Sequence, residues 1–186
     1  MSKSKEHIKT YSGIYFNPLQ IKTEHIAIED IAHSLSLQCR GGGHIRRFFS
    51  VGQHSINCAR EAFHRGYSHR VQLACLLHDA SEAYLSDITR PVKRQLKEYM
   101  EIEEVVQGAV WEAHFPEPLN REERELVQEI DEVMLYHELF HLMEEQLEVE
   151  EPPLFGELDL GTRHFEEVEE HFLQLYKLLR EELDRC

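Results

Sequence analysis

The sequence predicts an all-α, single-domain fold, a helical bundle of roughly six or seven helices. Two observations carry this prediction. Apolar residues recur at helical spacing along most of the chain, and no segment shows convincing apolar–polar alternation of a half-buried strand. The length agrees, because 186 residues can bury a hydrophobic core within one domain.

The N-terminal part contains one short helix between two irregular stretches. Residues 1–26 are expected to be irregular or extended, because Gly13, Pro18 and β-branched residues are scattered through them. A helical pattern then runs from Ile26 to Gln38. Three consecutive glycines after Arg40 break the helix and leave the backbone permissive.

The next two helices are predicted from their capping residues. Ser50, with Gln53 three residues on, has the pattern of a capping box. We expect this helix to reach about His64, where Gly66 provides the residue that ends it. Ser68 then opens a helix that is apolar almost all round, which is typical of a buried helix.

The C-terminal half is predicted to hold three longer helices. Pro91 opens the first, which continues to about Phe115, since proline is tolerated in the first turn. Asn120 caps the second, which runs to about Leu147, and Thr162 caps the last.

These elements give one continuous domain. Residues 1–26 form an N-terminal segment that packs on the domain, and residues 27–147 form its core. Residues 148–161 are a loop with two prolines, and residues 162–186 are the C-terminal helix of the same domain.

The charge balance bears on the choice of partner. The chain has 20 Lys and Arg against 35 Asp and Glu, a net charge of −15. Such a surface repels nucleic-acid backbones and anionic lipids, so we expect neither a nucleic-acid nor a membrane partner. A small anionic substrate would need a local arginine or a metal ion.

The cysteines indicate a reducing compartment. None of Cys39, Cys58, Cys75 and Cys186 forms a CxxC pair, and no apolar stretch follows the N-terminal lysines as in a signal peptide. We therefore expect a cytoplasmic protein. Cys58 and Cys75 lie in apolar helical patterns and are expected to be small core residues.

Four polar residues occupy otherwise apolar helical faces: His54, His78, Asp79 and Asp131. Each has an ordinary explanation when taken alone, such as a hydrogen-bonded core histidine, or a partly exposed or arginine-paired aspartate. Together, two imidazoles and two carboxylates form a mixed nitrogen and oxygen set suited to a divalent metal ion. A buried carboxylate is costly unless it is paired or binds a metal.

The pattern H…HD…D on helices resembles the HD-domain metal-dependent phosphohydrolases, especially their compact bacterial 5′-nucleotidase-like branch. Two stretches carry the resemblance: RGGGHIRRFFSVGQHS (Arg40 to Ser55) and LLHDASEAYLSDITRPVK (Leu76 to Lys93). The resemblance runs from about Ser12 to Asp131 and includes the helical Asp131.

The resemblance implies one divalent metal ion, bound by His54, His78, Asp79 and Asp131. The sequence leaves its identity open among Mn, Co, Zn, Mg, Ni and Fe.

The resemblance also implies catalytic and phosphate-binding residues. Glu82 stands where the family's HDxxE pattern places its acid–base residue, and Asp87 corresponds to a second acid in the following turn. A turn-capping role for Asp87 stays open. Arg40 and Arg47 are candidates for binding the substrate phosphate, which a guanidinium can hold through two hydrogen bonds.

The implied reaction is hydrolysis of a phosphate monoester, with a nucleoside or deoxynucleoside 5′-monophosphate as the expected substrate. Gly41 departs from the family, whose members place a bulky aromatic residue after the arginine, so sugar preference stays open. The alternatives are a nucleoside triphosphate or nucleotide second-messenger hydrolase with the same metal site, and a non-enzymatic helical interaction module. A homodimer is also open.

Overall fold

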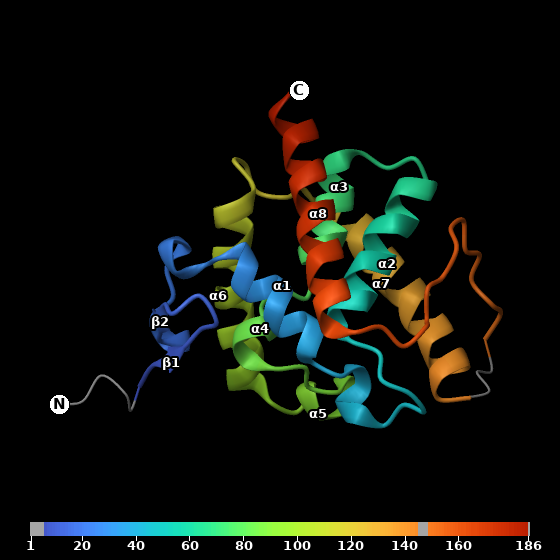
Figure 1. Ribbon diagram of the computed structural model, residues 1–186, viewed down its shortest axis with the longest axis horizontal. Helices are drawn as coiled ribbons and strands as arrows, with labels where there is room; N and C mark the ends of the chain where they lie inside the picture. Colours follow the sequence, from blue (N-terminus) through green and yellow to red (C-terminus); the bar gives the residue numbers. More distant parts are fainter. Residues whose placement is uncertain (1–5, 145–148, 186) are drawn as a thin grey trace.

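Six helices of nine residues or more make up most of what the computed structural model describes, residues 6–144 and 149–185 (Figure 1). Two single-turn helices lie between the third and fourth of them. The prediction of an all-α bundle is confirmed. The long helices are α1 (Ile28–Leu37), α2 (Val51–His64), α3 (His69–Leu77), α6 (Lys97–His114), α7 (Arg121–Leu142) and α8 (Phe165–Asp184), and the short ones are α4 (Glu82–Leu85) and α5 (Arg90–Lys93).

A hairpin of two two-residue strands precedes the bundle, where the sequence predicts irregular or extended chain. Strand β1 (Ile8–Lys9) pairs antiparallel with β2 (Tyr15–Phe16), and the 3-10 turns Pro18–Gln20 and Thr23–His25 follow. Strands this short cannot show an alternating pattern in the sequence. Phe16 is fully buried, with its ring centroid 4.8 Å from that of Tyr84, and so attaches the hairpin to the bundle.

Three predicted helix caps are present. Ser50 Oγ accepts a hydrogen bond from the Gln53 amide at 3.1 Å, and Gln53 Oε1 accepts one from the Ser50 amide at 3.3 Å. Asn120 Oδ1 accepts from the Glu123 amide at 2.9 Å, and Ser68 caps α3. These bonds satisfy amides that a helix N-terminus otherwise leaves free, which is why the starts of α2, α3 and α7 were predictable.

The predicted glycine breaks are also present. After α1 the chain forms a 3-10 turn over Arg40–Gly43, in which Gly41 and Gly42 have φ angles of 60° and 61°. These are left-handed conformations that a residue with a side chain rarely adopts. Gly66, with a φ of 72°, follows the end of α2.

Three predicted boundaries are wrong. The helix expected from Pro91 to Phe115 is two helices, because Leu96 has a φ of −106° and a ψ of 73° and interrupts it. Residue periodicity continues across this break and therefore hides it. Thr162 is not the cap of α8, which begins at Phe165 after His164. Helix α7 ends at Leu142 rather than Leu147, a residue outside the described part of the chain.

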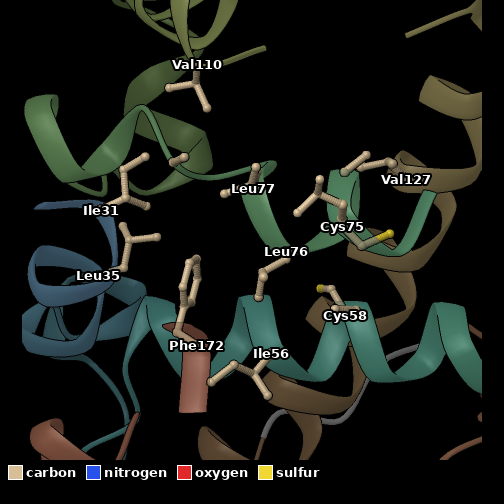
Figure 2. Packing of buried hydrophobic residues seen from close by; sticks show 14 of the residues in the cluster. Ile31, Leu35, Ile56, Cys58, Cys75, Leu76, Leu77, Val110, Val127 and Phe172 are labelled. Carbon is tan, nitrogen blue, oxygen red and sulfur yellow. The ribbon is translucent and has the colours of Figure 1, made fainter. Parts of the chain in front are cut away.

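The hydrophobic core lies where α1, α2, α3 and α8 meet. Figure 2 shows Leu35, Leu76 and Phe172 from three of these helices turned toward one another, and all three are fully buried. Cys58 and Cys75 are fully buried in the same core, as predicted. Burying one such large apolar side chain contributes about 1.5–3 kcal/mol to the free energy of unfolding. None of the described helices combines the length and apolar character that a bilayer crossing requires.

The packing of α2, α3 and α7 positions the candidate site. Helix α2 packs against α3, and both contact α7 (Figure 1). His54 lies in the first turn of α2, His78 directly follows the last residue of α3, and Asp131 lies within α7. Residues far apart in the sequence therefore meet at one place in the bundle.

Candidate metal centre

The structure brings together the four residues of the H…HD…D pattern. His54 Nε2 lies 3.2 Å from His78 Nε2, 3.6 Å from Asp79 Oδ2 and 3.3 Å from Asp131 Oδ1. His78 Nε2 lies 3.4 Å from the same Asp79 oxygen and 3.7 Å from the same Asp131 oxygen. Ligands at about 2.0–2.2 Å around a tetrahedral cation would be roughly 3.3–3.6 Å apart. The spacing fits donors around a single ion.

Hydrogen bonds orient both imidazole rings. The Nδ1–H of His78 donates to the Cys75 carbonyl at 2.8 Å, and the Nδ1–H of His54 donates to Glu138 Oε1 at 2.6 Å. These acceptors account for the proton on each Nδ1 atom. The lone pair of each Nε2 is then directed toward the cluster, as metal coordination by a neutral imidazole requires.

The two aspartates of the cluster are held in their anionic form. Burial would raise the pKa of Asp131, but its hydrogen bonds and charge interactions with His54 and His78 hold it well below its ordinary value. Burial likewise opposes ionisation of Asp79, yet His78 and Arg40 lower its pKa. Ionised carboxylates are the form that binds a metal ion. Burial opposes the charge of both histidines as well, yet their carboxylate neighbours raise the pKa of each ring. The cluster therefore favours positive charge, which a proton supplies and which a divalent cation bound to the neutral rings would replace.

Cys58 adds a sulfur atom to the same place. His54, Cys58 and His78 form a group that could hold a metal ion, with candidate ligand atoms all within 4.8 Å of one another. Cys58 Sγ lies 3.5 Å from His54 Nε2 because the two residues are one turn apart on α2. Burial raises the pKa of Cys58 to about 11, so its sulfur is a neutral thiol and a weaker donor than the carboxylates. The spacing of four residues between His54 and Cys58 was the signal in the sequence that could have placed this sulfur beside the cluster.

A cavity of about 710 Å³ opens beside the cluster. Asp79 and Asp131 form part of its wall, and the C-terminal part of α7 contributes apolar side chains. Positive side chains from α5 lie on another side, where Arg90 donates to Asp131 Oδ2 at 2.5 Å and Lys93 pairs with Glu103 at 2.6 Å. Its further lining includes Arg40, Gly41, Ile45, Glu82, Asp87, Leu135, Glu138, Leu139 and Leu142.

Glu82 and Asp87, the predicted catalytic acids, both line this cavity. Glu82 is the first residue of α4 and is buried. Glu82 Oε2 and Asp87 Oδ2 are buried oxygens without a hydrogen-bond partner in the part of the chain that the structure describes. Such atoms are rare in native proteins, and a water, an ion or a ligand in the cavity would satisfy them. Burial, together with the charges of Asp79 and Asp87, raises the pKa of Glu82 to about 9.

The turn-capping alternative for Asp87 finds no support in its contacts. Asp87 uses its backbone N–H, which donates to Gln38 Oε1 at 3.1 Å. No amide donates to the Asp87 carboxylate among the described residues. Its side chain is therefore available to the cavity.

Arg40 reaches into the cluster. Its Nε donates to Glu138 Oε2 and one terminal nitrogen donates to Asp79 Oδ2, both at 3.3 Å. The other terminal nitrogen lies 3.2 Å from His54 Nε2. Burial opposes the charge on Arg40, but Glu138 and Asp79 raise its pKa, so the guanidinium stays charged. A guanidinium beside a metal cluster can bind a phosphate group.

Arg47 lies elsewhere. Its side chain is exposed, and its Nε–H donates to the Leu160 carbonyl at 3.0 Å. It is absent from the cavity lining. The structure therefore brings Arg40 to the cluster but not Arg47, and we do not include Arg47 in the proposed site.

Sequence analysis missed Glu138 and Arg90. Glu138 lies seven residues after Asp131 on α7, two helical turns on, so it shares a face with Asp131. That spacing was the only signal, since acidic residues are frequent along this helix. The arginine partner that the sequence leaves open for Asp131 is present in the structure, but nothing in the sequence marks Arg90 as that partner.

Comparisons with known proteins find similar sequences, and the proteins named below are described only as uncharacterized. No protein-family model matches the chain. The chain is 39% identical over 107 residues to the uncharacterized protein YfdR of Escherichia coli (strain K12), a match that covers 58% of this chain and 57% of that protein. It is 41% identical over 91 residues to the uncharacterized protein RCAP_rcc00048 of Rhodobacter capsulatus, which covers 46% of each. The chain thus spans about half the length of the curated relatives it matches, and the resemblance to HD-domain phosphohydrolases stays a prediction.

Proposed function

We propose that this chain is a divalent-metal-dependent phosphohydrolase that cleaves a phosphate monoester of a small molecule, with a nucleoside 5′-monophosphate as the first candidate. The observation that carries the proposal is the convergence of two imidazole nitrogens and two carboxylate oxygens within 3.2–3.7 Å. They adjoin a cavity that is also lined by a partly buried arginine and a buried glutamate. This is the combination that metal-assisted phosphate-ester hydrolysis requires.

The residues present fit a divalent cation. His54, His78, Asp79 and Asp131 would hold it, because their donor atoms have the spacing of ligands around one ion. A nitrogen and oxygen donor set suits Mn, Co, Zn, Ni and Fe, and Mg where waters complete the coordination. Such a cation supplies Lewis-acid activation of water and neutralises charge at the phosphate.

The remaining groups would bind the substrate and move its protons. Arg40 would bind the phosphate, supplying a local positive site in a protein of net charge −15. Glu82 would exchange a proton with the attacking water or the leaving oxygen, since it lines the cavity and its Oε2 has no hydrogen-bond partner among the described residues. Asp87 would orient Glu82 or the water through its own free oxygen.

The cavity supports a substrate with an apolar body. Its volume of about 710 Å³ lies within the range of ligand pockets, roughly 300–1,000 Å³. Ile45, Leu135 and Leu139 line it together with the charged cluster. A nucleoside monophosphate combines a flat, weakly polar base with a single phosphate, which matches these two environments.

The test is a metal analysis of the purified protein combined with a phosphatase screen over nucleotides. We expect bound divalent metal and release of inorganic phosphate from nucleoside monophosphates, lost with a chelator and restored by metal. Pyrophosphate or triphosphate as the product would instead indicate the triphosphate or second-messenger alternative. A protein that binds no metal and hydrolyses no phosphate ester would contradict the proposal and favour the interaction module.

A further inference from the structure

A buried carboxylate on α7, that of Glu138, contacts both the proposed metal ligand His54 and the guanidinium of Arg40. We infer that Glu138 is a positioning residue, whose one oxygen fixes the His54 ring with Nε2 toward the metal cluster and whose other oxygen holds the Arg40 guanidinium beside it. The consequence for metal binding rests on the proposed function, whereas the contacts themselves do not.

The two oxygens of Glu138 have separate partners. Oε1 accepts from His54 Nδ1–H at 2.6 Å, and Oε2 accepts from Arg40 Nε–H at 3.3 Å. Glu138 is only 5% exposed, so water cannot replace either partner easily. A carboxylate that uses both oxygens on two different groups fixes their relative position as well as their orientation.

The charges of the buried groups explain why a carboxylate is needed at this place. Three carboxylates, those of Asp79, Asp131 and Glu138, meet the guanidinium of Arg40 at this place, and Arg40 lies 3.3 Å from both Asp79 and Glu138. Without Glu138, the positive charge of Arg40 would be balanced mainly by Asp79, which lies 3.3 Å from it. Arg40 would then compete with the cation for one of its ligands.

The bond to His54 acts on the metal through the imidazole ring. A histidine that donates its Nδ1–H to a carboxylate is held in one tautomer, and its Nε2 becomes a stronger donor. His54 is fully buried, and Glu138 is the carboxylate within hydrogen-bonding distance of its Nδ1. His78 uses the weaker acceptor, a backbone carbonyl, for the same purpose.

The inference is tested by the affinity for Zn²⁺, measured by competition with a chelating dye. Glu138→Gln keeps the size of the side chain but loses its charge, and we expect the affinity to fall by about 10–100-fold. Glu125→Gln is the matched control, because Glu125 lies on the same helix in an exposed pair with Arg121. Glu138→Asp keeps the charge but is too short to reach both partners. It should also weaken binding, and it takes the place of the Gln variant if that variant does not fold.

A spectroscopic measurement separates positioning from a merely structural role. In Zn²⁺-loaded protein labelled with ¹⁵N in its histidine side chains, the Nδ1 proton of His54 should be protected from exchange, and Glu138→Gln, whose amide oxygen is a weaker acceptor than a carboxylate, should reduce this protection. Wild-type Zn²⁺ affinity in a folded Glu138→Gln variant would overturn the inference and leave the proposed function standing. Absence of Zn²⁺ binding in the wild type would instead refute the proposed function, and with it the role of Glu138.

Discussion

The Nε2 atoms of His54 and His78 lie 3.2 Å apart, although 24 residues separate them along the chain. Both rings use Nδ1–H for a hydrogen bond, so both Nε2 lone pairs point toward the same place. Two lone pairs at this distance repel one another unless a proton or a cation lies between them. A nitrogen of the Arg40 guanidinium lies 3.2 Å from His54 Nε2, and with the carboxylates of Asp79 and Asp131 it completes an environment that favours positive charge between the rings.

Removal of one of these rings should remove the metal. His78→Ala takes away one Nε2 donor, and we expect the metal affinity to fall by more than about 100-fold, beyond the loss typical of a residue that acts through a ligand. The measurement is metal content per chain by mass spectrometry after dialysis. His141→Ala is the control, because His141 is exposed on α7. Wild-type metal content in His78→Ala would contradict the site.

Loss of the proposed proton donor should affect turnover and not metal content. Glu82→Gln keeps the shape of a buried side chain that lines the cavity. If Glu82 moves a proton during hydrolysis, kcat should fall on the order of 10²–10⁴-fold. The measurement is kcat for a nucleoside monophosphate, with metal content determined on the same samples. Wild-type turnover with full metal occupancy would show that Glu82 is a buried acid without a role in proton transfer.

The starts of the helices were predictable because the capping residues that fix them lie close together in the sequence. The capping boxes at Ser50 and Asn120 are decided within four residues, and the structure contains both. The break at Leu96 depends on a single pair of backbone angles, which apolar spacing does not report. Thr162 does not cap α8 because the chain bends at Gly161, where the Asp159 side chain accepts from Gly161 and Arg163, and the helix begins only at Phe165.

The candidate site was predictable where polar residues interrupt apolar faces. His54, His78, Asp79 and Asp131 stood out for this reason, and the structure brings them together. Glu138 did not stand out, because α7 carries many acids and only the packing of α7 on α2 buries this one. Which arginine enters the cavity depends on how the 3-10 turn after Cys39 directs the chain, and sequence spacing cannot determine this.

Replacement of Arg40 by lysine should damage phosphate binding although the charge is kept. Lysine is a point charge without the planar fork that can hold two phosphate oxygens. The buried Glu138 would also lose its Nε–H donor. We expect kcat/KM to fall by about tenfold or more, which corresponds to about 1.4 kcal/mol. Arg47→Lys is the matched control, because Arg47 is absent from the cavity lining. Equal kcat/KM values for Arg40→Lys and wild type would exclude Arg40 from this role.

Sugar discrimination should be weak. Gly41 lines the cavity without a side chain. An apolar pocket rejects an added hydroxyl by no more than about 10²-fold even when it is shaped for this purpose. We expect kcat/KM for AMP and dAMP to agree within about tenfold. A strong preference for dAMP would mean that another residue excludes the 2′-hydroxyl. A Gly41→Trp variant is not a clean test, since the φ of 60° would strain any side chain there.

The last prediction concerns His114 and stability in mild acid. His114 ends α6 and is 7% exposed, its Nδ1 lies 2.9 Å from the Tyr176 hydroxyl, and its Nε2 is buried without a partner among the described residues. Burial and the charge of Arg180 lower the pKa of His114 from 6.5 to about 4. The unfolded chain therefore takes up a proton near pH 6.5, whereas the folded chain does so only near pH 4. Stability from this group is complete above the unfolded pKa and is lost as the pH falls toward the folded pKa.

Between about pH 7.5 and about pH 5 the loss should be about 2 kcal/mol. His114→Gln does not titrate, so its free energy of unfolding should fall by about that much less over the same interval. Urea unfolding followed by circular dichroism, at both pH values and for both proteins, measures the difference while the other titrating groups cancel. Parallel pH profiles for the two proteins would show that His114 accepts its proton as readily in the folded chain as in the unfolded one.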